Sequence, residues 1–301
     1  MKRFYPSVGL GKICRLFGVT RQAYYKQKNK EDALFLQDVI IIQLVQQVRK
    51  KLPYTGTRKL LTMLEDCFAQ HHIRIGRDKL FDLLSAHGLL IRRRKRRYPK
   101  TTDSNHRFRK YPNLLNTLTL TRTEQLWVSD ITYLSLPDGF CYLNLVTDAY
   151  SHRIMGYCLY PTLGAKGTFK ALRMALHKRT SPDLTLVHHS DRGTQYCCTE
   201  YVRLLTATHI SISMAKSENP IAERVNGILK SELGLDETFI SFKKAQSIVN
   251  DRIQSYNELR IHASCDYLTP QQAHQHKGAL NKRWKNYRKK YPTANSLNPI
   301  L

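Results

Sequence analysis

The N-terminal third of the chain carries apolar side chains at the three- to four-residue spacing of helices, interrupted by glycines. A first helix is predicted from Leu10 to Phe17, where Gly18 ends it, and Thr20 is a suitable cap for a second helix. Further helices are predicted over residues 32–50, from Thr57 to 64, and from about 76 to a stop at Gly88. A short strand is expected at 89–91.

From about residue 126 the pattern changes to short apolar runs separated by turn residues. Strands are predicted over 126–134, 142–147, 153–160, 184–189 and 210–214, with a turn at 137–139 between the first two. Helices are predicted over 166–178 and 199–207, and a last core helix begins at Asn219. Three antiparallel strands followed by alternating helices and strands are the element order of a ribonuclease-H-like α/β domain with a mixed sheet.

These elements divide the chain into five predicted regions. Residues 1–30 have the helix, glycine turn and capped helix of a helix-turn-helix, although an ordinary helical hairpin has the same pattern. Residues 31–91 resemble a second helix-turn-helix unit, 92–120 are a basic linker, 121–240 the α/β core, and 241–301 a helical, basic C-terminal region.

The net charge of the chain predicts a class of binding partner. The 301 residues include 49 Lys and Arg against 23 Asp and Glu, a net charge of +26, which indicates a polyanionic partner such as DNA or RNA. An anionic membrane surface is the competing interpretation, but the sequence has no basic amphipathic helix that would lie on one, and no apolar run approaches the ~20 residues of a membrane span. We therefore expect no membrane partner. In a helix-turn-helix, Arg21, Gln22 and Lys26 on the second helix would face DNA.

The basic linker begins with six consecutive cations, Arg92, Arg93, Arg94, Lys95, Arg96 and Arg97. Such a block stays solvated because its charges repel, so it is expected to be a flexible linker that also lies along DNA phosphates.

Cysteine usage and the N-terminus indicate a compartment. The seven cysteines, at 14, 67, 141, 158, 197, 198 and 265, are scattered and contain no Cys-x-x-Cys pair, which is typical of a reducing cytosol. The N-terminus lacks the order of regions found in a signal peptide, so a cytoplasmic, nucleoid-associated location is expected. Cys67 with His71 and His72 does not complete a four-ligand zinc set.

Three carboxylates are the candidate chemistry. Asp130 interrupts an apolar strand, where an acid is costly unless it is paired or binds a cation; Asp191 follows the fourth strand; and Glu223 lies near the start of the last core helix. Taken singly, each is more often a turn, cap or helix-dipole residue. Together they suit Mg²⁺ or Mn²⁺, which prefer hard oxygen ligands, and two such ions ~4 Å apart can cut or join a nucleic-acid backbone.

Basic residues beside these acids are candidate phosphate contacts. Lys230 lies two helical turns after Glu223 on the same face, although a plain surface lysine is the alternative. Arg192 and Arg224 each follow one of the acids directly, and Gly193 gives Asp191 a turn that lets it point into a cleft.

Four ordered motifs resemble the catalytic (OrfB-type) subunit of integrase-like insertion-sequence transposases, DDE enzymes related to retroviral integrases. They are Trp127-x-x-Asp130-Ile-Thr-Tyr, His189-Ser-Asp191-Arg-Gly-x-Gln-Tyr, Asn219-x-x-Ala-Glu223-Arg-x-Asn-Gly-x-Leu-Lys230, and Tyr256-Asn-x-x-Arg260-x-His followed by Thr269-Pro-x-x-Ala. The resemblance covers nearly the whole chain.

The resemblance implies Asp130, Asp191 and Glu223 as a catalytic, metal-binding triad. It implies cleavage at the ends of an insertion element and attack of the freed 3′-hydroxyl on target DNA, with an oligomer assembled on double-stranded DNA. It also implies, for many such proteins, fusion to an upstream DNA-binding frame, and this chain is then expected to be the downstream part.

The chain departs from the family pattern at one place. Thirty-one residues lie between Asp191 and Glu223, fewer than the family usually has, and the shortfall falls at 215–218. The alternatives are a tolerated loop shortening, with Glu218 as an outside candidate for the third ligand, or a catalytically decayed or regulatory DNA-binding protein. A ribonuclease of the same fold is less favoured, because helix-turn-helix units suit the major groove of duplex DNA.

Overall fold

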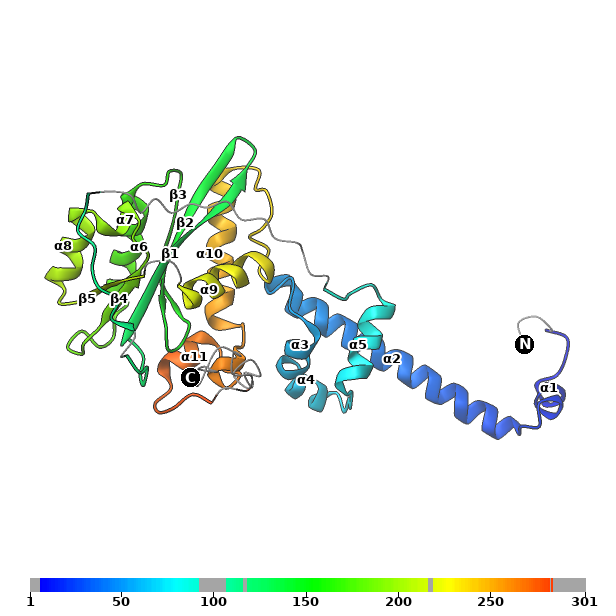
Figure 1. Ribbon diagram of the computed structural model, residues 1–301. Coiled ribbons are helices and arrows are strands. Elements are labelled where there is room, and N and C mark those ends of the chain that lie inside the picture. The colour runs from blue at the N-terminus through cyan, green and yellow to red at the C-terminus, as the bar shows by residue number, and fades with distance from the viewer. Residues whose placement is uncertain (1–5, 92–106, 116–117, 216–218, 282, 284–301) are drawn as a thin grey trace, which may run out of the picture. The chain divides into compact units, whose positions relative to one another are not determined.

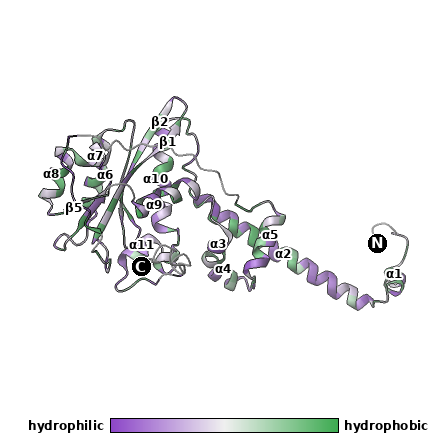
Figure 2. Cartoon of the chain, in the orientation of Figure 1, coloured by the Kyte–Doolittle hydropathy of each residue, from purple (hydrophilic) through white to green (hydrophobic). Residues whose placement is uncertain are grey.

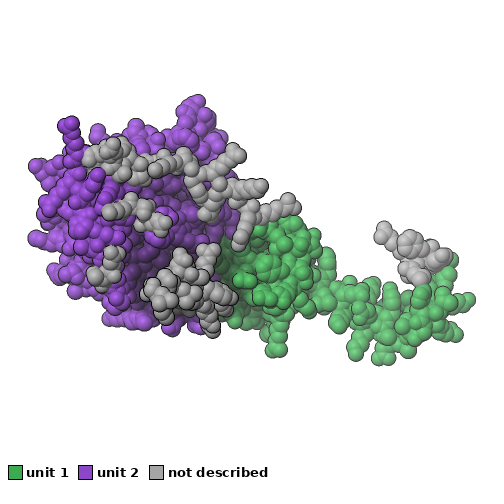
Figure 3. Space-filling view, in the orientation of Figure 1, with its two compact units in different colours: residues 1–50, 55–92 green, residues 51–54, 93–301 purple. Residues whose placement is uncertain are grey.

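A computed structural model describes residues 6–91, 107–115, 118–215, 219–281 and 283, and divides them into two compact units (Figures 1 and 3). Unit 1 comprises residues 1–50 and 55–92, and unit 2 comprises 51–54 and 93–301. The predicted basic block at 92–97 and Glu218 lie outside the described residues. No helix in the described ranges is long and apolar enough to cross a bilayer.

Unit 1 is helical, as the periodicity predicts. Its helices are α1 (Leu10–Leu16), α2 (Arg21–Lys51), α3 (Thr57–Met63), α4 (Glu65–Gln70) and α5 (Arg77–Ala86). A core of apolar side chains from α2 to α5 holds it together, with Ile41 and Val45 of α2 packed against Leu60, Leu80 and Leu84.

Two glycine stops in unit 1 work as predicted. Gly18 and Gly88 both have a left-handed backbone (φ 66° and 65°), and the next residue donates its N–H back into the helix, Val19 to Cys14 and Leu89 to Leu84. The predicted strand at 89–91 is therefore wrong: these three residues follow the end of α5 and pair with no strand in the described part of the chain.

The helix after Gly18 is longer than expected. Thr20 caps it as predicted, accepting the N–H of Ala23 at 3.0 Å, but α2 then continues without a break to Lys51. The boundary predicted at residue 30 therefore falls inside a single helix.

Unit 2 is built on a five-stranded mixed sheet in the order β3-β2-β1-β4-β5. The strands are β1 (Leu126–Leu136), β2 (Gly139–Asp148), β3 (Ile154–Tyr160), β4 (Val187–Ser190) and β5 (Ser211–Met214). The first three are antiparallel neighbours, while β4 pairs parallel to β1 and β5 parallel to β4. This confirms the ribonuclease-H-like arrangement; β4 begins three residues later than predicted.

Helices cover both faces of the sheet (Figure 1). One face carries α6 (Ala165–His177), α7 (Thr194–Cys197) and α8 (Thr199–Ala207), whose apolar residues share a core with Trp127 of β1. In Figure 2 these helices carry both hydrophobic and hydrophilic residues. Gly156 of β3 is needed for close packing, because an added Cβ would lie 2.0 Å from the carbonyl oxygen of Ala171 on α6.

The other face carries α9 (Pro220–Ser231) and α10 (Phe242–Glu258), followed by the short helices η2 (Ala263–Cys265) and α11 (Pro270–Gln275). The fourth family motif clamps this layer. The Asn257 side chain exchanges two hydrogen bonds with the backbone of Ile154 (2.9 and 3.0 Å), and Arg260 forms a two-pronged ion pair with Glu232 at the end of α9. The predicted helical C-terminal region thus fixes the helix that carries Glu223.

Candidate active site

The sheet register places Asp130 and Asp191 at equivalent points of adjacent strands. In the parallel pair of β1 and β4, Val128 lies opposite His189. Asp130 comes two residues after Val128, and Asp191 two after His189, directly past the end of β4. Since side chains alternate between faces, both acids are on the face of Val128, which packs against Ala222 of α9.

Helix α9 brings Glu223 to the same face. Asn219 occupies the N-cap position and Pro220 the first helical position, as predicted. The Asn219 side chain makes no capping bond, however; it donates instead to the carbonyl oxygen of Ser129 on β1 (3.2 Å). Its backbone N–H donates to Oε1 of Glu223 (3.4 Å), so one residue ties the helix to the strand and orients the acid.

The three carboxylates interact electrostatically. Burial, the negative charge of Asp191 and, more weakly, that of Glu223 together raise the pKa of Asp130 to about 7, against two hydrogen bonds that lower it. An acid that charges near neutrality beside two other acids is suited to bind a cation, which would replace its proton.

Hydrogen bonds hold the two aspartates in place. The Ile131 N–H donates to Oδ1 of Asp130 (2.9 Å), and Nδ2 of Asn226 donates to Oδ2 (2.7 Å). The N–H of Gly193 donates to Oδ1 of Asp191 (2.9 Å), which is the tight turn predicted after β4. Asp130 is thus engaged on both oxygens by groups that stabilise its charged form.

A neutral polar layer lies under the aspartates. Nε2 of the buried His188 is 2.7 Å from Ser129 Oγ and 2.9 Å from the Tyr201 hydroxyl, and burial lowers the pKa of His188 to about 3, which keeps it uncharged. Tyr196, 2% exposed, has its pKa raised by burial and then by Asp191 and Asp130, and its hydroxyl has no hydrogen-bond partner among the described residues.

Sequence reasoning did not assign a role to Asn226, Asn219 or Tyr196 in this site. Each of these three residues stands in a family motif. Asn226 also lies one turn after Glu223 on the same helix face, and this spacing is the sequence signal that could have identified it. The contact itself joins residues 96 positions apart, which no local pattern contains.

The basic candidates occupy different environments. Arg224 is exposed and Arg192 partly exposed beside the acids, while Arg21, Gln22 and Lys26 are exposed on α2 of unit 1. Lys230 is only 4% exposed, and its ammonium lies 3.8 Å from the centre of the Tyr133 ring. Its predicted phosphate contact stays a prediction, and it would require the side chain to leave this ring.

The three carboxylates are a suitable donor set for hard divalent ions, and each ion would be held by two of them. Among the described residues, no group of three acid, histidine or cysteine side chains is placed to hold one ion together. Mg²⁺ is usually bound by one or two carboxylates together with water and substrate phosphate oxygens, so two of these acids per ion suffice.

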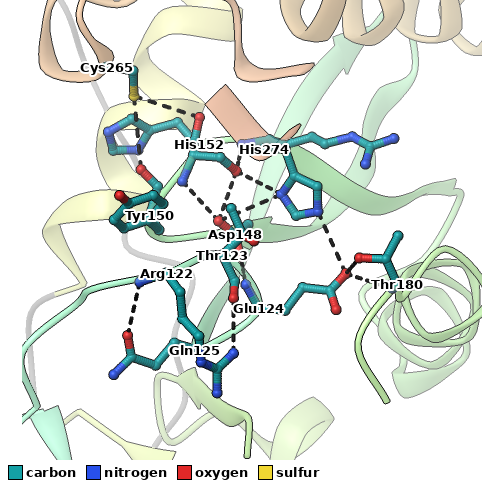
Figure 4. Close-up of polar contacts among 12 residues, drawn as sticks. Arg122, Thr123, Glu124, Gln125, Asp148, Tyr150, His152, Thr180, Cys265 and His274 are labelled. Atoms are coloured by element: carbon teal, nitrogen blue, oxygen red, sulfur yellow. Dashed lines mark hydrogen bonds and ion pairs between the residues drawn. The ribbon is translucent and has the colours of Figure 1, made fainter. Parts of the chain in front are cut away.

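A second polar cluster lies where β2 ends beside the start of β1 and is structural (Figure 4). Burial raises the pKa of Asp148, which accepts the N–H groups of Glu124 and Ser151. His274 of α11 lies between the acids, with Nδ1 3.0 Å from Ser151 Oγ and Nε2 3.6 Å from Glu124 Oε1. These contacts anchor the C-terminal helices to the sheet.

Two family comparisons cover the catalytic unit. Residues 121–220 match one family described as integrase core domain, and residues 208–270 match a second with the same description. Among solved structures, the HTLV-2 integrase catalytic core domain in complex with magnesium is 20% identical, with a TM-score of 0.41, covering 51% of this chain and 97% of that one.

Relatives in bacteria extend the match along the chain. An insertion element IS600 31 kDa protein of Shigella sonnei is 33% identical over 267 residues, covering 86% of this chain and 96% of the relative. The transposase InsF of insertion sequence IS3A from Escherichia coli is 35% identical over 153 residues, 49% of this chain and 53% of InsF. The chain therefore belongs to the insertion-sequence transposases with an integrase core domain that include these IS600 and IS3 proteins.

Proposed function

We propose that this transposase cuts DNA at the ends of its insertion element and joins the freed 3′-hydroxyl to target DNA, using Asp130, Asp191 and Glu223. The observation that carries the proposal is the convergence of three carboxylates from β1, the end of β4 and α9 on one face of the sheet, close enough for the latter two to raise the pKa of Asp130. Structural acids would be expected to pair with cations instead of with one another.

The three acids would hold Mg²⁺ or Mn²⁺, two ions between them. Such ions, when bound, supply charge that activates the attacking oxygen and stabilises the leaving one. The surrounding residues would keep the ligands in position: Asn226 orients Asp130, Gly193 orients Asp191, and Asn219 orients Glu223.

The proposed reaction consists of two successive displacements at phosphorus. In the first, water attacks a phosphodiester at the element end, and the P–O3′ bond breaks to leave a 3′-hydroxyl. In the second, that hydroxyl attacks a target phosphodiester, and the target's 3′-oxygen leaves as its own hydroxyl. Arg192 and Arg224, which each follow one of the acids in sequence and are partly or fully exposed, would contact the DNA phosphates, with Lys230 as a further candidate.

The DNA partners in this proposal are the terminal repeats and the target, both double-stranded. Arg21, Gln22 and Lys26 of α2 and the block from Arg92 to Arg97 would contribute further contacts, and an oligomer would hold two ends together. Assembly with an upstream-frame DNA-binding protein, by fusion or association, belongs to the same proposal.

The test is a cleavage and strand-transfer assay on a labelled duplex carrying an end of the encoding element, in Mg²⁺. Product is expected from the wild type and from Glu218→Gln, and none from Glu223→Gln. Product from Glu223→Gln but not from Glu218→Gln would move the third ligand to Glu218. No product from any variant, with DNA binding intact, would favour a decayed copy or a required upstream partner.

A further inference from the structure

Three tyrosines lie in a row across the sheet of unit 2. Tyr133 of β1 pairs directly with Tyr142 of β2, and Tyr142 pairs in turn with Tyr160 of β3. Residues that lie opposite each other in antiparallel strands point to the same face, so these three side chains share one face at neighbouring positions. Two strand spacings separate the ends of the row, which is therefore roughly 10 Å long.

Phe140 extends the row toward the tip of the β1–β2 hairpin. Its ring centre lies 5.2 Å from that of Tyr133 with an interplanar angle of 77°, an edge-to-face contact. Phe140 is 50% exposed, and the three tyrosines are partly exposed. We name Tyr133, Phe140, Tyr142 and Tyr160 the aromatic row. Exposed rings gathered at one place on a sheet indicate a surface that binds a partner.

The row lies where α6 begins, on the face of the sheet that this helix covers. A Cβ added to Gly167, in the first turn of α6, would lie 3.0 Å from the Cβ of Tyr160. Further along the helix, the Ala171 oxygen lies over Gly156, nearer the start of β3. Helix α6 therefore runs from the row toward the start of β3 and leaves the hairpin tip uncovered, and this hairpin extends beyond β4 and β5 (Figure 1).

Lysines stand at both ends of the row. The ammonium group of Lys230 lies 3.8 Å from the ring centre of Tyr133, and that of Lys170 lies 5.3 Å from the ring centre of Tyr160. Proteins bind single-stranded nucleic acid with this combination, in which rings stack on bases and cations contact phosphates. Aromatic pairs across strands also stabilise a hairpin, but that role requires neither the flanking lysines nor a half-exposed phenyl ring.

The row begins beside the candidate active site. Tyr133 follows Asp130 by three residues on β1, which is about 10 Å along a strand. The pairing of β1 with β4 covers residues 126–128, so the edge of β1 is open to the side chain of Lys230 beyond that point. Lys230 comes from α9 on the other face and reaches the ring of Tyr133, so it joins the face of the acids to the aromatic row.

We propose that the aromatic row binds single-stranded DNA, with two or three bases stacked on its rings and with Lys230 and Lys170 on the phosphates. A sheet surface of this width holds that number of bases in RNA recognition motifs. The proposal rests on the proposed function for its substrate, an unpaired strand that continues from the phosphate at the acids. A base that stacks on Tyr133 takes the place of the Lys230 ammonium, which is then released to a phosphate.

The test measures binding of a fluorescein-labelled single strand of about 12 nucleotides to the full-length chain in EDTA, by fluorescence anisotropy. Phe140→Ala is expected to weaken this binding about five- to hundredfold, the loss of one base–aromatic stack, and Phe140→Trp should retain it. Affinity for a duplex of the same sequence should stay unchanged, because paired bases do not present their faces. Tyr267→Ala removes another exposed ring of unit 2 and is the matched control, which should leave both affinities unchanged.

The lysines are tested by the salt dependence of the same binding. Lys170→Gln should reduce the slope of log affinity against log salt by about 0.7, the contribution of one phosphate contact on a single strand. Lys243→Gln removes an exposed lysine from α10, on the other face of the sheet, and should leave the slope unchanged. Thermal melting of each variant separates loss of binding from loss of folding.

Three results would overturn the proposal: a Phe140→Ala protein that binds the single strand as tightly as the wild type, a Phe140→Trp protein that binds as weakly as Phe140→Ala, or an equal loss on single strand and duplex. The assay contains no metal, so its outcome is separate from catalysis. A wild type that binds the single strand through Phe140 but transfers no strand refutes the catalytic proposal alone. An active wild type whose single-strand affinity is independent of Phe140 refutes the aromatic row alone.

Discussion

Asp130→Asn is expected to stabilise the metal-free protein at pH 8 while abolishing catalysis. The folded-state pKa of Asp130 is raised to about 7 from 3.8. Between these values the folded state holds a proton that the unfolded chain releases, so stability falls as pH rises through this interval. The destabilisation by the charged carboxylate is absent below about pH 4 and fully present above about pH 7. A neutral side chain at position 130 avoids this destabilisation.

The size of the effect follows from two opposing contributions. A pKa difference of about three units corresponds to about 4 kcal/mol of destabilisation by the charged carboxylate. Against this, Asp130 accepts from two donors, Ile131 and Asn226, and an amide offers one oxygen, so one donor loses its partner at about 1–3 kcal/mol. The net stabilisation by Asp130→Asn is therefore about 1–3 kcal/mol, or about 5 °C in Tm.

The assay is thermal unfolding in EDTA followed by tryptophan fluorescence, since Trp127 is fully buried in the same sheet. The variant should melt higher than the wild type at pH 8, and the advantage should vanish or reverse near pH 4. Added Mg²⁺ should raise the Tm of the wild type and not that of the variant. Equal melting temperatures at pH 8, or a difference that does not change with pH, would refute the assignment of a strained carboxylate at Asp130.

Three further substitutions test the surroundings of the site. Asn226→Ala removes a 2.7 Å hydrogen bond to the β1 carboxylate and should slow strand transfer about ten- to hundredfold in Mg²⁺ while DNA affinity in a gel-shift assay is unchanged; an unaltered rate would contradict its positioning role. Gly156→Val should destabilise unit 2 by more than about 2 kcal/mol, because the Cβ would lie 2.0 Å from the Ala171 oxygen, whereas Gly164→Ala, with its nearest contact at 3.7 Å, is the melting control. Glu124→Gln should destabilise the protein at pH 7 by up to about 3 kcal/mol, and its stability should converge with that of the wild type near pH 2. The reason is that burial raises the pKa of Glu124, but hydrogen bonds outweigh burial and hold the pKa at about 2. Parallel curves of stability against pH for the two proteins would contradict this prediction.

The fold was predictable because its signals are local. Alternating and continuous apolar runs located all five strands, and glycines at 18 and 88 fixed two helix ends by backbone conformation. The length of α2 was also encoded, since no glycine or proline occurs between Gly18 and Pro53, although the predicted boundary at residue 30 divides this stretch. The strand expected at 89–91 failed because the N–H of Leu89 closes the end of α5, and the side chains of Leu90 and Ile91 are exposed.

The site was predictable only as far as its acids. An aspartate within an apolar strand is energetically unfavourable unless it has a partner, so Asp130 was a candidate from the sequence alone. The partners that make it tolerable, Asn226 and the N–H of Ile131, depend on how α9 crosses β1, and that crossing is set by contacts between distant segments. Likewise, Lys230 has the spacing of an exposed residue two turns from Glu223, yet the ring of Tyr133 on β1 covers it.

The short spacing between Asp191 and Glu223 does not prevent the acids from converging. The Ala215 N–H donates to the Ser190 carbonyl oxygen beside Asp191 (2.9 Å), and the Asn219 side chain donates to the Ser129 carbonyl oxygen beside Asp130 (3.2 Å). Both ends of the shortened segment are therefore fixed to the two strands that carry the aspartates, with three residues, 216–218, between them. Because the position of Glu223 is set by Asn219 and by the Arg260–Glu232 clamp at the far end of α9, residues can be lost between these anchors while the third carboxylate keeps its place. This geometry favours a working transposase over a decayed copy, and it predicts that Asn219→Ala, which releases one anchor, should reduce strand transfer more than Glu218→Gln.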